Sequence, residues 1–128
     1  MSVLRDAKAI AFVLSKDVAA LIPFYRDTLG LPLIAQDPFA ATFDLGGGTT
    51  LRLTAVESHV PAPHTVLGWR VDDLDATLDA LEAAGVKAQI YEGFGQDARG
   101  VWTNPGGGAR IVWFLDPEGN NLSLTQFG

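Results

Sequence analysis

Residues 9–31, AIAFVLSKDVAALIPFYRDTLGL, contain the pattern that decides the fold. The apolar run at 9–15 predicts a strand, and Asp17 supplies a side-chain oxygen that can cap the helix after it. Apolar residues then recur at helical spacing, and Gly30 can adopt the left-handed conformation that ends a helix. Pro23 falls inside this helix, so we expect a kink there or a later start.

The rest of the first half favours strands rather than a second helix. Its apolar stretches are separated by glycine, proline and aspartate, which are typical of turns. The triplet Gly46, Gly47 and Gly48 forms the turn before the last stretch. The predicted strands lie at 32–37, 39–45 and 49–56.

The second half repeats this order. A strand at 64–71 leads to Asp72 or Asp73, either of which can cap a helix that Gly85 ends. With Asp73 as the cap, the two caps lie 56 residues apart and the two helix-ending glycines 55. Further strands are predicted at 86–91, 109–115 and 121–126, with a loop at 92–100 and a short strand near 100–103 as an option.

We therefore predict an α+β protein built from two βαβββ modules, residues 9–56 and 64–126, joined by a connector at 57–63. Each module alone would leave one face of its sheet bare. We expect the two to pack together as a single domain over residues 1–128.

The composition excludes several classes of function. The 128 residues include no cysteine, so a disulfide scaffold, a thiolate zinc site and an iron–sulfur cluster are ruled out. The formal charge of −6 argues against a nucleic-acid partner, because phosphate binding needs a basic face. No stretch is apolar enough to span a membrane, and the first residues lack a signal-peptide pattern, so we expect a cytoplasmic protein.

Three stretches together resemble a known family: residues 24–31 (FYRDTLGL), 68–75 (GWRVDDLD) and 116–120 (DPEGN). They are similar to the vicinal oxygen chelate superfamily, which includes glyoxalase I, extradiol dioxygenases, fosfomycin-resistance enzymes and bleomycin-resistance proteins. The resemblance covers nearly the whole chain. It implies curled mixed sheets around a shared cavity, and it implies a homodimer because such folds often pair modules across chains.

In the metalloenzymes of this family, four strand residues hold a divalent cation in the cavity. The resemblance puts Ile10, Arg52, Val66 and Ser123 at those positions. Isoleucine and valine have no lone pair to give, arginine stays protonated, and a lone serine is a poor ligand. We therefore predict no metal and no other cofactor, with a divalent metal held by other residues as the alternative.

Strand alternation from these positions predicts most of the side chains that line the cavity. The resemblance adds Trp113, and Trp102 borders the loop at 92–100. Arg52 could bind a carboxylate or simply pair with an acidic neighbour. His64 could act on a ligand or lie at the surface, and Trp113 could be a stacking wall or plain core. The candidate ligand-binding residues are Phe12, Arg52, Thr54, His64, Trp102, Trp113, Asn121 and Ser123.

The sequence thus favours a small-molecule-binding protein of the glyoxalase and bleomycin-resistance type, without a metal. One alternative is a glyoxalase-like lyase or a dioxygenase whose metal site is unusual or completed by substrate. Another is an interaction module whose cavity is filled by its own side chains.

Overall fold

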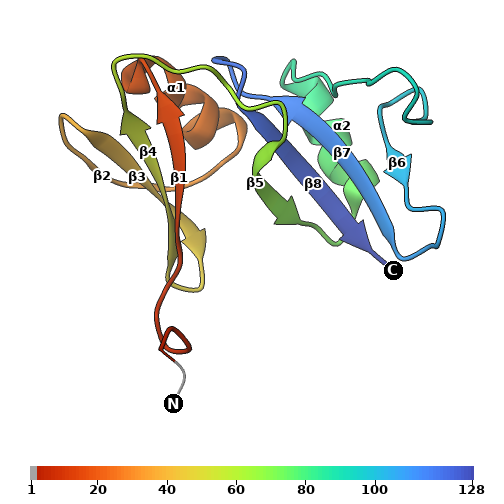
Figure 1. Cartoon of the computed structure of the whole chain (residues 1–128), viewed down its shortest axis with the longest axis horizontal. Helices are drawn as coiled ribbons and strands as arrows, with labels where there is room; N and C mark the ends of the chain where they lie inside the picture. The colour runs from red at the N-terminus through yellow and green to blue at the C-terminus, as the bar shows by residue number, and fades with distance from the viewer. Residues whose placement is uncertain (1–2) are drawn as a thin grey trace. The chain divides into compact units, whose positions relative to one another are not determined.

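The computed structural model describes residues 3–128. Met1 and Ser2 lie outside the described residues, and they are part of the chain start on which the cytoplasmic prediction rests. The chain forms two compact units, which meet in the sequence between Val60 and Pro61. Each unit contains one sheet of four strands and a helical segment (Figure 1).

In the first unit, the sheet has the strand order β1-β4-β3-β2. Strand β1 pairs with β4 in parallel, and the other pairs are antiparallel. The elements are β1 (Ile10–Ser15), α1 (Val18–Pro23), the π-helical segment η1 (Phe24–Thr28), β2 (Leu33–Gln36), β3 (Ala40–Gly46) and β4 (Thr49–Ala55).

Alternation along these strands separates two faces of the first sheet. Leu51 and Leu53 of β4 are fully buried, as is Phe43 of β3. Tyr25 of η1 is also fully buried, and its ring centroid lies 5.9 Å from that of Phe43. The core of this unit therefore lies between the sheet and its helical segment. Ile10, by contrast, is 55% exposed.

Pro23 changes the type of helix without delaying its start. The helix begins at Val18, with the carboxylate of Asp17 accepting a hydrogen bond from the Ala20 amide at 3.2 Å. Proline has no N–H to donate, and its ring crowds the preceding turn, so regular α-helix ends there. One π-helical segment follows, and Gly30 then takes a positive φ of 75°, as predicted.

In the second unit, the sheet has the order β5-β8-β7-β6, again with one parallel pair, β5 with β8. The register of that pair shifts between Thr65 and Leu67, which leaves Val66 in a bulge. The elements are β5 (Thr65–Arg70), α2 (Leu74–Ala83), β6 (Trp102–Thr103), β7 (Ala109–Leu115) and β8 (Asn121–Phe127).

The predicted strand at 86–91 is wrong. Only Ala88 forms a bridge, with Phe114, outside the named strands. The Gln89 amide also donates to the Trp113 carbonyl of β7 at 2.7 Å. Beyond this short contact with β7, the side chain of Gln96 accepts from the Tyr91 amide at 2.7 Å and donates to the Gln89 carbonyl at 2.9 Å. The segment is therefore held partly by β7 and partly by a side chain, and the optional strand near 100–103 is present as β6.

Each unit keeps the order strand, helix, three strands, so the predicted α+β class with two βαβββ modules is confirmed. Within residues 3–128, no helix has both the length and the apolar character needed to cross a membrane.

Of the two aspartates predicted as alternative caps of α2, the structure selects Asp73. Its carboxylate accepts from the Ala76 amide at 3.0 Å. Replacing it, Asp73→Ala, should lower the free energy of unfolding by about 1 kcal/mol, because the helix loses its cap. Asp72→Ala is the matched control and should change it by less than about 0.5 kcal/mol. Urea denaturation measures both, and equal losses would contradict the assignment.

Candidate functional site

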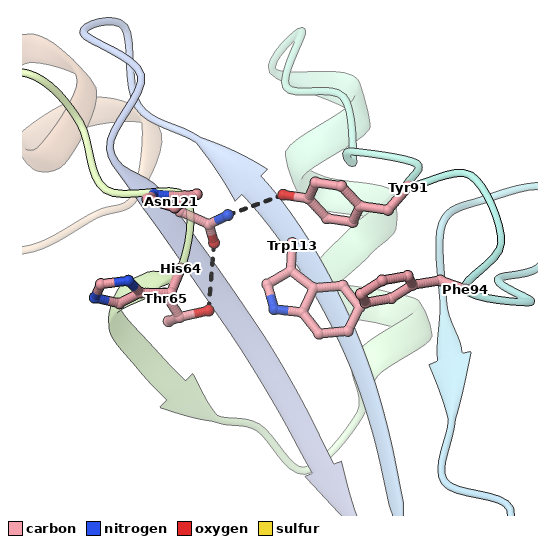
Figure 2. A pocket seen from close by; sticks show the side chains of 7 residues that line it. His64, Thr65, Tyr91, Phe94, Trp113 and Asn121 are labelled. Atoms are coloured by element: carbon pink, nitrogen blue, oxygen red, sulfur yellow. Dashed lines mark hydrogen bonds between the residues drawn. The ribbon is translucent and has the colours of Figure 1, made fainter.

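A pocket of about 350 Å³ lies within the second unit, on the face of its sheet opposite α2 (Figure 2). Its walls are mostly aromatic, with a few polar side chains between them. No Asp, Glu, Lys or Arg is among the residues that line it. We call it the aromatic pocket, and its lining residues are Pro63, His64, Thr65, Tyr91, Phe94, Trp113 and Asn121.

Strand alternation in β7 and β8 brings the floor of this pocket together. Val112 and Phe114 are buried in the core, so Trp113 between them points to the other face. Asn121 pairs with Thr65 of the neighbouring strand and lies on that same open face. The pocket therefore draws on three strands or strand ends of one sheet.

Four aromatic rings form a continuous cluster on this face. The centroid of Trp113 lies 5.9 Å from that of Tyr91, 6.0 Å from that of Phe94 and 6.5 Å from that of Trp102. The first two pairs are edge-to-face, an arrangement that aromatic side chains favour. Trp102 lies outside the aromatic pocket but lines a second hollow of about 340 Å³ with Phe94 and Trp113.

The polar side chains of the pocket form a chain of hydrogen bonds. Thr65 Oγ1 donates to Asn121 Oδ1 at 3.3 Å, and Asn121 Nδ2 donates to the Tyr91 hydroxyl at 2.9 Å (Figure 2). Asn121 is only 4% exposed, so these bonds satisfy a buried amide.

The loop at 92–100 forms one wall through Phe94 and is tied down at several points. Gln96 donates to the Gly100 carbonyl at 2.7 Å, in addition to its bonds on either side of Ile90. Arg99 reaches helix α2, at 2.8 Å from Glu82 and 2.7 Å from Asp79. These hydrogen bonds raise the pKa of the Arg99 guanidinium, which stays charged.

The candidate residues fall into two groups. His64, Trp113 and Asn121 line the aromatic pocket. Ser123 shares their sheet but is 92% buried against Gly68, where an added Cβ would lie 2.6 Å from the Ser123 hydroxyl oxygen.

The remaining candidates belong to the sheet of the first unit. Phe12 of β1 is paired with Arg52 of β4, and Thr54 follows two residues later on the same face. Phe12 is 57% exposed, whereas Arg52 and Thr54 are half-buried. Arg52 has no ion pair within 4 Å among the described residues.

The chemistry of the four family positions does not fit a divalent cation. They carry two aliphatic side chains, Ile10 and Val66, one guanidinium and one hydroxyl. Val66 also lies in the bulge of β5. In the described part of the chain, no three His, Cys, Asp or Glu side chains gather in a group that could hold a metal ion.

Thr65 is the pocket residue that strand alternation from Val66 misses. Alternation puts His64 and Gly68 on the pocket face and Thr65 on the other, but the bulge brings Thr65 to the pocket face as well, where it pairs with Asn121. Tyr91 and Phe94 border the loop in the sequence. Their approach to Trp113 depends on the turn that Gln96 holds, which no local pattern indicates.

Comparison with known proteins identifies relatives of the whole chain. The family model described as Glyoxalase/Bleomycin resistance protein/Dioxygenase superfamily matches residues 9–124. The sequence matches none of the curated proteins.

Solved structures of similar fold cover nearly the full length of the chain. An antibiotic binding protein from Streptomyces sp. CB03234 is 26% identical, with a TM-score of 0.72, and the match covers 96% of this chain and 97% of that one. A glyoxalase / bleomycin resistance protein from Catenulispora acidiphila is 27% identical, with a TM-score of 0.70 and coverage of 94% and 98%. A lactoylglutathione lyase from Agrobacterium tumefaciens is 20% identical, with a TM-score of 0.71 and coverage of 94% and 93%.

The bonds of Gln96 make the pocket wall testable. The variant Gln96→Ala should speed hydrogen exchange of the Tyr91 amide at least about tenfold, because the amide loses its acceptor and the loop opens locally. Exchange followed by NMR measures this. Glu92→Ala, a change at an exposed neighbour, should leave the Tyr91 amide unaffected. Unchanged protection in Gln96→Ala would show that the loop is held by other contacts.

Proposed function

The chain belongs to the glyoxalase/bleomycin resistance protein/dioxygenase superfamily, and on that premise we propose that it is a small-molecule-binding protein. It holds a flat organic ligand in the aromatic pocket and works without a metal.

The aromatic pocket is the observation that carries this proposal. Its volume of about 350 Å³ falls within the range of about 300–1,000 Å³ that is usual for small-molecule sites. Phe94 is 52% exposed although it packs against Trp113. A flat ligand against these rings would bury apolar surface that water now covers, which stabilises the complex.

The lining also indicates the charge of the ligand. The pocket lacks carboxylate, ammonium and guanidinium groups, and its one imidazole, His64, is exposed. A charged ligand against the rings would therefore lose hydration without gaining a buried ion pair. The net charge of −6 would attract a cationic ligand, whereas Arg52 could bind an anionic one. That arginine belongs to the first unit, and the aromatic pocket itself suits an uncharged molecule.

The relatives support binding more than catalysis. The antibiotic binding protein is 26% identical to this chain over nearly its whole length, which favours a role in holding a drug-like molecule. The likeness to the lactoylglutathione lyase, at 20% identity, reflects the fold alone. The four family metal positions carry no suitable donor set, so a lyase or dioxygenase reaction through them is disfavoured.

Ligand binding should depend on Trp113. In a thermal-shift screen of uncharged planar aromatic compounds, we expect stabilising hits, worth about 2.7 kcal/mol at about 100 times the Kd. Trp113→Leu should abolish these shifts because it removes the central ring of the pocket. Trp69→Leu, a change in the same sheet outside the pocket, should preserve them. Hits that survive Trp113→Leu would place the ligand elsewhere.

We also propose a homodimer, and the cytoplasmic location stays a prediction. Ile10 and Phe12 lie two residues apart on the same face of β1, and each is more than half exposed. A second copy that covers them would bury apolar surface. Native mass spectrometry of tag-free protein should give twice the chain mass without metal. A monomer would contradict the dimer, and one divalent ion per chain would contradict the metal-free proposal.

A further inference from the structure

The hydrogen bonds of the aromatic pocket all run in one direction. Thr65 Oγ1 donates to Asn121 Oδ1, and Asn121 Nδ2 donates to the Tyr91 hydroxyl oxygen, at 3.3 and 2.9 Å. Asn121 is 96% buried, and these two bonds give a partner to each end of its amide. The chain of bonds therefore ends at the Tyr91 hydroxyl.

This arrangement leaves the Tyr91 proton available. A phenol carries a single O–H donor, and its oxygen here already accepts from Asn121. Among residues 3–128, the structure gives the hydroxyl of Tyr91 no acceptor. Tyr91 lines the aromatic pocket, so a bound molecule can supply that acceptor.

The ring of Tyr91 is held in place before any ligand arrives. Phe94 and Trp113 pack against it, with ring centroids at 5.4 and 5.9 Å. Its backbone amide donates to Gln96 Oε1 at 2.7 Å. A donor fixed in this way loses little side-chain entropy when it forms one more hydrogen bond.

Trp113 carries a second hydrogen-bond donor, its indole N–H, beside the hydroxyl of Tyr91. The indole N–H can only donate, and the described residues give it no acceptor. Figure 2 shows the indole nitrogen on the side of the ring away from Phe94. The pocket thus presents two unused donors.

We propose that the Tyr91 hydroxyl is a specificity-determining donor, which selects uncharged aromatic ligands that carry a carbonyl or a similar hydrogen-bond acceptor. This inference rests on the proposed function and names the ligand class of the same pocket. Tyr91 contacts the ligand directly, whereas Asn121 and Thr65 are positioning residues that direct its proton outward. A ligand with a donor at this point would leave two donors facing each other, which costs affinity.

Two naphthalenes of nearly the same shape test the proposal. 2-Acetylnaphthalene carries a carbonyl acceptor, and 2-isopropenylnaphthalene replaces that oxygen with a CH₂ group. By calorimetric titration, the wild type should bind the acetyl compound about tenfold more tightly. In Tyr91→Phe this preference should disappear, while the affinity for 2-isopropenylnaphthalene stays the same because the rings remain.

The positioning role of Thr65 has its own readout. Thr65→Val should reduce the ratio of the two dissociation constants, because Asn121 loses the donor that orients it, and Thr65→Ser should restore the ratio. A purely structural role would change both affinities together and leave their ratio unchanged.

The outcomes separate this inference from the proposed function. Equal binding of both compounds by the wild type would overturn the inference, and so would a preference for the acetyl compound that persists in Tyr91→Phe. Neither result would contradict the proposal that the pocket binds a flat ligand. Binding of neither compound would overturn the pocket proposal and the inference with it.

If Tyr91→Phe does not fold, the infrared carbonyl band of 2-acetylnaphthalene bound to the wild type decides instead. A shift to lower wavenumber relative to the band in cyclohexane supports the hydrogen bond. An unshifted band overturns the proposal.

Discussion

Strand alternation in the second sheet is the constraint on which the pocket depends. Val112 and Phe114 of β7 are almost fully buried, so the residue between them points to the opposite, open face. A one-residue slip would reverse this and place the indole of Trp113 in the core. The same constraint puts Asn121 on the open face, opposite Leu115 of β7 and Thr65 of β5.

The irregular parts of the second unit complete what the strands begin. The bulge at Val66 turns Thr65 towards the open face, where it orients Asn121. Gln96 binds the backbone on both sides of the loop and so holds Tyr91 beside Trp113. Residues of regular strands form the floor of the pocket, and a loop held by side-chain hydrogen bonds forms its wall. The candidate site therefore combines apolar aromatic rings with polar side chains whose hydrogen bonds run in one direction, from Thr65 to Tyr91.

Local pattern was enough to predict the regular elements. The strand at 109–115 has the predicted bounds, and Gly85 ends α2 with a φ of 86° as expected. The failures lie where a distant side chain decides the backbone. Hydrophobic pattern alone cannot reveal that Gln96 bonds the backbone around Ile90 where a regular strand was expected, or that β5 contains a bulge. The sequence therefore indicates Trp113 and Asn121 as pocket residues but gives no sign of Thr65.

The central claim is that a flat organic molecule binds against the rings of the aromatic pocket. Intermolecular nuclear Overhauser effects between the wild-type protein and 2-acetylnaphthalene test it most directly. Cross-peaks from the naphthalene protons to ring protons of Trp113 and Phe94 are predicted. Cross-peaks only to the first sheet, for example to Phe12, would contradict the claim, as would their complete absence at saturating ligand.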